Sequence, residues 1–508
     1  MNKNKSILKT AGFMAIATLL AKMCGLAREV LIAAFFSTGY EGTAYLTATQ
    51  LPMTLFDIVI GGVISASFIP IFNDILEKKD KKSAMEFANR FICMILFICI
   101  LIAVFGIIFA DPLISFMAPD FDQKTHNLAA LLSSVMFPMI IFTGLAFSFV
   151  GILQTFDEFN IPAIMSLVSN VAVILYFPVF GKKFGVYGLS AAMLFSWSLQ
   201  VIIQIPSLKK FGFRLKPTYK IWNNDIKRAL LLAGPMLVST WVQPLYSIVN
   251  TRIASGIDGA VPVLNYANRL YIVVTGVFSF VVTNLVFPKM SRANSADNSE
   301  ETNAIIVASL KAVSMVILPI AVMFITLSNP IISVIYNHGK FDAVNETAIA
   351  LSCYSVGMIG MSVNEVLSKA FFSMQNSKTP MINAVISMLC NIGLAYALSE
   401  LFGVGGLALA TAFGSLINAL LNYICMRKLR GKLFAKWDTA DIAKIIISAV
   451  CCFAAVSALY VPLKSWAAAG WIQSLVSGIV CGAAGLIVYA AVIFASGESD
   501  IRKILKKE

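Results

Sequence analysis

The chain has 508 residues, of which 58% are apolar and only 13% are charged, and its mean hydropathy is +0.83. Soluble domains carry about 25% charged residues, so this composition excludes a soluble globular protein. The formal net charge of +13 raises the question of a nucleic-acid partner. The basic residues, however, gather in short segments between long apolar runs, which favours a membrane surface instead.

Apolar runs of spanning length predict an all-α polytopic membrane protein, because the strands of a membrane β-barrel give shorter, alternating segments. About fourteen spans are expected from these runs. The predicted ranges are 8–37, 44–73, 88–110, 127–153, 162–180, 185–207, 226–253, 262–288, 303–327, 346–373, 381–400, 404–426, 442–462 and 470–495. The first run imitates a signal peptide, but it lacks a cleavage site of small residues and Lys22 follows at once, so we interpret it as an uncleaved span.

The loops between the predicted spans alternate in charge. One set, which includes both termini, contains the basic segments EKKDKKS, KKFGFRLKPTYK, RKLRGKLFAK and IRKILKKE, whereas the opposite set contains few Lys or Arg residues. Because short basic loops remain on the cytoplasmic side of a membrane, both termini are predicted to be cytoplasmic.

Short sequence matches recur about 218 residues apart. DPLIS at 111–115 resembles NPIIS at 329–333, and FGVYGL at 184–189 resembles FGVGGL at 402–407, each at an offset of 218. The remaining matches are Pro162 with Pro380 and Pro70 with Pro288 at the same offset, and ATQL at 48–51 with ANRL at 267–270 at an offset of 219. Together they predict two copies of a six-span unit, followed by two further spans.

This repeat predicts four parts: an N-lobe at 1–207, a cytoplasmic linker at 208–225, a C-lobe at 226–428, and two C-terminal spans with a basic tail at 429–508. Six is an even number, so both lobes keep the same orientation in the membrane. Transporters with such parallel repeats bind their substrate between the halves, near the midplane. We therefore expect two six-helix lobes around a central cavity.

The first span contains AKMCGLAREVLIAAFF at 21–36, with Lys22, Arg28 and Glu29. A charged side chain at the centre of a membrane helix costs roughly 2.5–3.5 kcal/mol on insertion scales and usually faces a protein interior or a wet cavity. Arg28 and Glu29 are sequence neighbours, which do not face each other on a helix, so we expect a wide charged wedge and not a neutral ion pair. Gly25 is a candidate hinge.

Spans 2 and 8 carry polar residues at helical spacing. Those on span 2 are Thr47, Gln50, Thr54, Asp57, Gly61 and Ser65, and those on span 8 are Asn265, Asn268, Arg269, Gly276, Ser279 and Thr283. The two spans are equivalent in the repeat, and with span 1 they predict a shared hydrated cavity. In it Lys22, Arg28 and Arg269 outnumber Glu29 and Asp57, which suits an anionic substrate, especially a phosphate.

A purely structural interpretation of these residues is the alternative: links between helices, or side chains that snorkel from span ends. It is strongest for Arg252, close to the predicted outer end of span 7. No catalytic constellation is recognisable, since both histidines, His126 and His338, fall in predicted outer loops and the nine cysteines fit no metal spacing. We expect a transporter without metal or cofactor, not an enzyme, and one that uses an ion gradient or the membrane potential.

Six segments together resemble the MurJ (MviN) lipid II flippases, which belong to the superfamily of multidrug and oligosaccharidyl-lipid exporters. They are GLAREVLIAAFF, QLPMTLFDIVIGGVISASFIPIF, YANRL, YNHGKFD, YSVGMIG and SKAFFSMQNSKTP, and the resemblance covers about residues 5–430. It implies a fourteen-helix protein of the bacterial cytoplasmic membrane with a cationic central cavity. The implied substrate is lipid II, the undecaprenyl-pyrophosphate-linked peptidoglycan precursor, moved from the inner to the outer leaflet.

The resemblance also implies roles for individual residues. Arg28 of GLARE and Arg269 of YANRL match substrate-binding cations of the family, and Lys22 stands where many members have arginine. Arg252 is expected to assist near the outer exit, Glu29 and Asp57 to tune the cavity charge or couple an ion, and Gly25, Gln50 and Asn268 to serve as hinge and polar-stripe residues.

This chain has Phe56 and Asp57 where some members have two arginines. The departure keeps open the export of another polyprenyl-linked oligosaccharide. A cation-coupled drug antiporter is a further transporter alternative, although surplus cations argue against cationic drugs. A non-transporting scaffold for envelope-synthesis enzymes is the alternative from another class.

Overall fold

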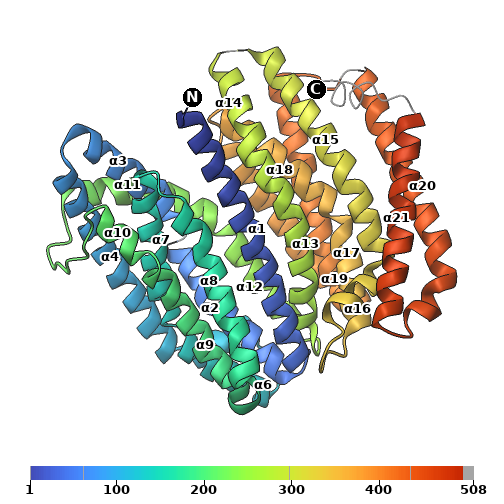
Figure 1. The fold of residues 1–508 in the computed structure, drawn as a ribbon, viewed down its shortest axis with the longest axis horizontal. Helices are drawn as coiled ribbons and strands as arrows, with labels where there is room; N and C mark the ends of the chain where they lie inside the picture. The colour runs from blue at the N-terminus through green and yellow to red at the C-terminus, as the bar shows by residue number, and fades with distance from the viewer. Residues whose placement is uncertain (1, 61, 297, 435, 496–508) are drawn as a thin grey trace. The chain divides into compact units, whose positions relative to one another are not determined.

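The computed structural model describes residues 2–495 apart from 61, 297 and 435. Within these residues every regular element is a helix, which confirms the predicted all-α fold class (Figure 1). A helix pairs its own backbone N–H and C=O groups, as a chain surrounded by lipid requires. Two compact units are present, Met1–Pro262 and Val263–Glu508, and each is described by itself.

The helices of the first unit follow one another closely along the chain. They are α1 (Asn2–Phe36), α2 (Tyr40–Val59), η1 (Ile64–Phe68), α3 (Ile69–Lys78), α4 (Lys81–Ile108), α5 (Ala110–Met117), α6 (Gln123–Met136), α7 (Met139–Thr155), α8 (Asn160–Tyr176), η2 (Phe177–Gly181), α9 (Lys182–Ile202), α10 (Ile205–Lys210), α11 (Asn224–Thr240) and α12 (Val242–Ala254). Asp80, Asp122 and Asn223 accept backbone N–H groups at the starts of α4, α6 and α11, which is the usual capping chemistry of a helix N-terminus.

The second unit begins within α13. Its helices are α13 (Ala260–Val281), η3 (Val282–Val286), α14 (Phe287–Ser295), α15 (Ser299–Thr326), α16 (Ser328–Tyr336), α17 (Val344–Val356), α18 (Met358–Ser373), α19 (Lys378–Arg430), α20 (Lys436–Ala467) and α21 (Trp471–Ala495).

Each of the predicted spans coincides with a helix or with a series of helices. Among the described residues, 6 helices are long and apolar enough to cross a membrane, or up to 8 if the bent pairs α6–α7 and α17–α18 each count as one span. Two of these six, Asn160–Lys210 and Lys378–Arg430, are 51 and 53 residues long and each cover two predicted spans. Predicted spans 1, 2, 7 and 8 fall on α1, α2–α3, α11–α12 and α13–η3. Spans 2 and 8 are those with the predicted polar stripes, and span 1 contains the charged residues Lys22, Arg28 and Glu29.

Local backbone features recur at the offset found in the sequence. The long helices are broken at Gly185 and Gly403, whose φ values of +52° and +54° cost glycine little, and these two positions lie 218 residues apart. The π-helical segments Ile64–Phe68 and Val282–Val286 are separated by the same interval. These recurrences support the internal repeat, while the exact limits of the lobes stay a prediction.

The first compact unit extends beyond the predicted N-lobe, because α11 and α12 pack within it. Arg228 of α11 donates to Asp74 of α3 over 2.6 Å, and Trp241 donates to the Ile58 carbonyl over 2.7 Å. Hydrogen bonds from Lys78 and Arg228 hold the pKa of the Asp74 carboxyl below its usual range. Predicted span 7 is therefore attached to the helices of the first unit.

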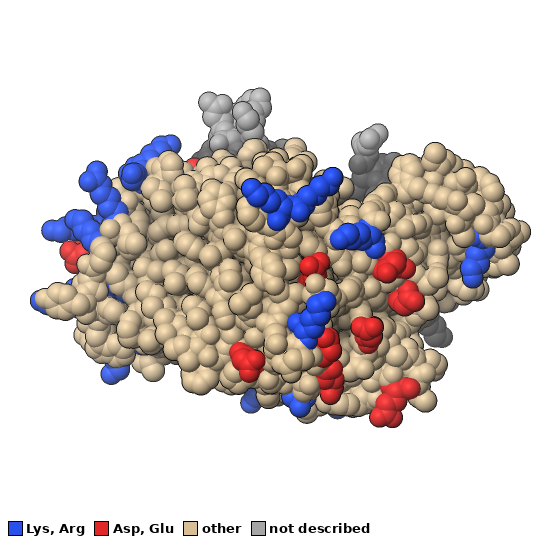
Figure 2. Space-filling model, turned by 90° about the horizontal axis from the view of Figure 1, so that it is seen from below, with Lys and Arg blue, Asp and Glu red and all other residues tan. Residues whose placement is uncertain are grey.

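Large apolar side chains face outward, as expected for a surface in lipid. Phe97 and Leu101 of α4 are 56% and 54% exposed, and Val450 of α20 is 60% exposed. Polar residues such as Asn383 and Asn422 of α19 are buried instead. On the face drawn in Figure 2 most of the surface belongs to residues other than Lys, Arg, Asp and Glu.

The C-terminal helices α20 and α21 run side by side as a hairpin (Figure 1). Tyr489 of α21 donates to the Met315 carbonyl of α15 over 2.7 Å, and Trp471 donates to the Val334 carbonyl of α16 over 3.1 Å. Buried Cys452, Val456 and other apolar side chains of the hairpin pack against the same region of the second unit. The hairpin is thus attached at several points along its length to other helices of the second unit.

A buried ionic cluster joins the start of α20 to α15. Lys311 Nζ lies 2.6 Å from Asp438 Oδ1 and 2.9 Å from Asp441 Oδ2, and Lys444 Nζ lies 3.5 Å from Asp441 Oδ1. Two cations and two carboxylates balance one another, which offsets the desolvation of charges with little exposure. Sequence analysis did not single out this cluster, because its partners are far apart in the chain.

Lys311→Met is expected to destabilise the protein by about 3–5 kcal/mol, because it removes the cation that contacts both carboxylates and leaves Asp441 with the more distant Lys444. The unfolding midpoint of the purified protein in detergent measures this. Lys369→Met is the control, since Lys369 forms a more exposed pair with Glu365 over 3.7 Å, and its loss should cost less than about 1 kcal/mol. Equal shifts in the two variants would contradict the prediction.

Candidate functional site

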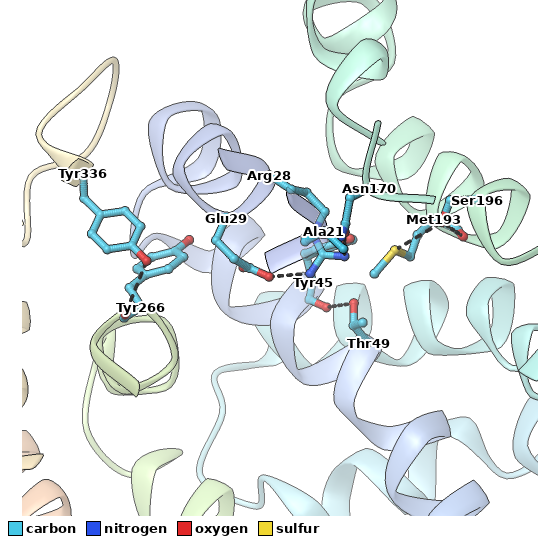
Figure 3. A network of polar contacts seen from close by, with 10 residues as sticks. All are labelled: Ala21, Arg28, Glu29, Tyr45, Thr49, Asn170, Met193, Ser196, Tyr266 and Tyr336. Carbon is cyan, nitrogen blue, oxygen red and sulfur yellow. Dashed lines mark hydrogen bonds and ion pairs between the residues drawn. The ribbon is translucent and has the colours of Figure 1, made fainter. Parts of the chain in front are cut away.

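A buried ion pair occupies the polar face of α1. Arg28 Nη2 lies 2.6 Å from Glu29 Oε1, and the side chains are 17% and 3% exposed. The expectation that these two neighbours would not pair is therefore wrong. Their Cα–Cβ bonds diverge on the helix, but the long arginine side chain curves around the helix surface and brings its guanidinium to the carboxylate (Figure 3).

The pair is completed from another helix. Asn170 of α8 accepts a hydrogen bond from Arg28 Nη1 over 3.0 Å and donates from Nδ2 to the Ala21 carbonyl of α1 over 3.2 Å. Arg28 Nε is buried and has no hydrogen-bond partner. The guanidinium is thus held at both terminal nitrogens and keeps unused donor capacity (Figure 3).

The remaining predicted residues of α1 lie on the N-terminal side of this pair. Lys22 is half-buried. The helix α1 continues through Gly25 without a break, from Asn2 to Phe36, and the hinge stays a prediction. A Cβ at Gly25 would lie 3.5 Å from Asn170 Nδ2, so this glycine is where the Asn170 amide approaches α1.

The polar stripe of α2 is directed in part toward α12. Gln50 Nε2 donates to Ser247 Oγ, and Gln50 Oε1 accepts from Thr251 Oγ1 over 3.2 Å. Thr47 and Thr54 are buried. In this structure the Gln50 amide therefore links two helices of the first unit. Gly61 and the Ser65 side chain lie outside the described residues.

Phe56 and Asp57 stand where some members of the resembled family have two arginines. Their side chains have different environments. Phe56 is 5% exposed and stacks on Phe147 with ring centroids 6.3 Å apart, whereas Asp57 is exposed. A charge at position 56 would be buried in the packed interior, so only position 57 presents its charge in this structure.

Arg252 lies at a separate place. Its Nη1 donates to the Phe116 carbonyl over 2.8 Å, and its guanidinium lies 5.7 Å from the centroid of the Phe116 ring. Phe116 is close to the C-terminus of α5, where a cation is favoured by the helix dipole. These contacts link α12 to α5.

The predicted residues of the second unit lie on α13. Arg269 is exposed and Asn268 is half-buried. Asn265 Oδ1 is buried without a partner, and Thr283 Oγ1 lies 3.4 Å from Glu365 Oε1 of α18. The Ser279 side chain lies outside the described residues. In the described part of the chain no group of three or more His, Cys, Asp and Glu residues is arranged to hold a metal ion.

Sequence analysis missed Asn170. A signal was present, since an asparagine in the middle of the largely apolar segment NIPAIMSLVSNVAVILY must find a partner inside the protein. The sequence contains no information on which partner that is, because Arg28 is 142 residues away.

The comparisons decide the family. The sequence profile of the family described as lipid II flippase MurJ matches residues 32–482. The chain belongs to the lipid II flippase MurJ family. The match begins just after Lys22, Arg28 and Glu29, so these residues lie outside the matched range. The resemblance seen in the sequence motifs is confirmed.

Two relatives with similar sequences agree with this MurJ family assignment. The chain is 29% identical to the lipid II flippase MurJ of Burkholderia cenocepacia, with 84% of each chain covered. It is 27% identical to the probable lipid II flippase MurJ of Rhizobium meliloti, with 98% of this chain and 96% of that one covered.

Two solved structures show the fold. A structure described as lipid II flippase MurJ in an inward closed conformation has a TM-score of 0.80 at 23% identity, and covers 97% of this chain and 99% of that one. An inward-facing multidrug resistance MATE transporter has a TM-score of 0.69 at 18% identity, over 81% of this chain and 95% of that one. The chain is thus a polytopic membrane protein with the fold of MurJ and MATE transporters.

The Arg28–Glu29 pair is expected to behave as a coupled unit in stability measurements. Glu29→Leu leaves a buried cation without its counter-charge and should cost about 3–5 kcal/mol, and Arg28→Met should cost a similar amount. The double variant should be more stable than either single variant, since it leaves no uncompensated charge. Unfolding midpoints of the four proteins complete the double-mutant cycle, and strictly additive effects would contradict the pairing.

Proposed function

We propose that this chain is a lipid II flippase, which moves the undecaprenyl-pyrophosphate-linked peptidoglycan precursor from the inner to the outer leaflet by alternating access. The family match over residues 32–482 carries the proposal. The chain resides in the bacterial cytoplasmic membrane with both termini in the cytoplasm, as the distribution of basic loops favours.

Arg28 is the proposed centre of pyrophosphate binding. Its guanidinium already holds one carboxylate, and phosphate oxygens suit the same planar, two-pronged geometry. A pyrophosphate carries more negative charge than a carboxylate, so it competes with Glu29 for this cation. Binding of the substrate therefore proceeds by exchange of one anion for another at Arg28.

The exchange has a consequence for Glu29. Once the pyrophosphate holds Arg28, the Glu29 carboxylate, which is 3% exposed in this structure, loses its counter-charge. Loss of a neighbouring cation is costly for a buried carboxylate, and uptake of a proton or another cation relieves the cost. Glu29 thus couples substrate binding to a cation, and Asp57 adjusts the local charge. The driving force is an ion gradient or the membrane potential, which acts on each charge with about 2.3 kcal/mol per 100 mV.

Other cations contribute in this proposal. Lys22, two turns before Glu29 on α1, and the exposed Arg269 of α13 each contact the pyrophosphate during the cycle. Arg252 assists at the outer exit, although its contacts with Phe116 give it a structural role in the present conformation.

Another polyprenyl-linked oligosaccharide is the second candidate cargo, and the exposed carboxylate of Asp57 favours it. It places a negative charge where some relatives have a cation. Both cargoes share the polyprenyl pyrophosphate and differ in the sugar and peptide.

Outer-leaflet lipid II, measured in bacteria depleted of their own flippase, tests the function. The native chain should restore outward lipid II, while Arg28→Ala and Arg269→Ala at matched membrane levels should lower it at least tenfold, since each removes a charge-assisted phosphate contact. Arg292→Ala is the matched control, because Arg292 is an exposed arginine that donates to the Pro288 carbonyl of its own helix.

Normal activity of both the Arg28→Ala and Arg269→Ala variants would refute the proposed mechanism. A well-expressed native chain that restores no outward lipid II, together with export of another polyprenyl-linked saccharide, would favour the second cargo.

A further inference from the structure

Asn170 lies on α8, outside the charged helix α1, yet it contacts Arg28 directly. We propose that Asn170 is a positioning residue, which fixes the Arg28 guanidinium in the orientation that receives the pyrophosphate. The proposal rests on the proposed function, and it adds α8 to the elements that determine substrate affinity.

The hydrogen bonds of Asn170 permit one orientation of its amide. Arg28 is purely a donor, so the group facing Nη1 must be the amide oxygen; the Ala21 carbonyl is purely an acceptor, so the group facing it must be the amide nitrogen. Rotation by 180° would break both bonds and oppose like groups. At 6% exposure no bulk water replaces the lost partners.

The two bonds also connect different turns of α1. The Ala21 carbonyl lies two turns before Arg28, and Gly25 lies between them on the side where the amide approaches. Asn170 therefore spans the stretch 21–28 and anchors the long, flexible arginine side chain to the backbone of its own helix. Glu29 accepts a hydrogen bond from the other terminal nitrogen, Nη2.

The part of α8 that contains Asn170 is itself held to neighbouring helices by hydrogen bonds. Gln200 of α9 donates to Ser169 Oγ over 3.1 Å. Gln204 donates to the Gln200 carbonyl over 3.0 Å and to the Ala146 carbonyl of α7 over 3.2 Å. Ser169, Gln200 and Gln204 are all buried. A functional side chain is oriented most sharply when its support is locked in this way.

A restrained guanidinium loses less side-chain entropy on binding an anion than a free one. The restrained guanidinium also keeps its orientation while a phosphate replaces the Glu29 carboxylate as its anionic partner. Asn170 does not carry charge and does not compete with the phosphate. Its removal should therefore weaken the affinity through Arg28 alone.

The test is a double-mutant cycle on the purified full-length chain, with inorganic pyrophosphate as the binding probe and lipid II flipping in reconstituted vesicles as the second readout. Asn170→Ala should weaken pyrophosphate binding about tenfold, because the released guanidinium must be ordered again when it binds the anion. In the Arg28→Ala background the same substitution should change nothing further. Asn170→Leu, which keeps the side-chain volume, serves the same purpose if Asn170→Ala does not fold.

Ser169→Ala is the matched control. It is on the same helix, is equally buried and loses the hydrogen bond from Gln200, but has no contact with Arg28. It should lower pyrophosphate affinity and flipping much less than Asn170→Ala does, because both hydrogen bonds of Asn170 itself stay intact.

Equal effects of Asn170→Ala in the native and Arg28→Ala backgrounds, or an equal loss in Ser169→Ala, would overturn the positioning role. A native chain that binds pyrophosphate but flips no lipid II would refute the proposed cargo, while the binding cycle would still decide the role of Asn170. If the native chain flips lipid II but binds free pyrophosphate too weakly to measure, the flipping rates of the same variants decide the positioning role of Asn170. A native chain with neither activity overturns both proposals.

Discussion

A charge that leaves water must find its counter-charge inside the protein, and this constraint governs the ionisable residues of both units. In the first unit Glu29 and Asn170 surround Arg28. In the second unit Asp438 and Asp441 surround Lys311. The first cluster joins α1 to α8, and the second joins α15 to α20. The requirement for pairing therefore also influences which helices pack together.

The two clusters have different chemistry and therefore different uses. Lys311 is shared by two carboxylates at the start of the α20–α21 hairpin, which Tyr489 and Trp471 also attach to neighbouring helices. In this cluster the charges balance, so its role is structural. Arg28 has one carboxylate, one neutral amide and an unpartnered Nε. A guanidinium with remaining donor capacity and an exchangeable counter-ion is suited to an anionic substrate.

The polar helices carry a further regularity. The apolar helices α4, α15, α20 and α21 are long and present large side chains outward, as membrane spans that mainly contact lipid and neighbouring helices do. The charged and amide residues that we connect to transport lie on α1, α2, α12 and α13, with Asn170 as the exception on α8. Asn170 is on an apolar span, yet it accepts a hydrogen bond from the charged residue Arg28 of α1.

The sequence by itself determined the helical membrane class, the positions of the spans, the family and the candidate cations, because hydropathy, loop charge and motif order are properties of the chain read locally. It also revealed the repeat through FGVYGL and FGVGGL, whereas the breaks at Gly185 and Gly403 within these motifs are seen only in the structure. Only the tertiary structure decided which charges are neutralised. Helical geometry argued against the Arg28–Glu29 pair, yet the length of the arginine side chain permits it. Asn170, Gln50 and Lys311 find partners more than a hundred residues away, and such contacts depend on how helices pack, which no local pattern encodes.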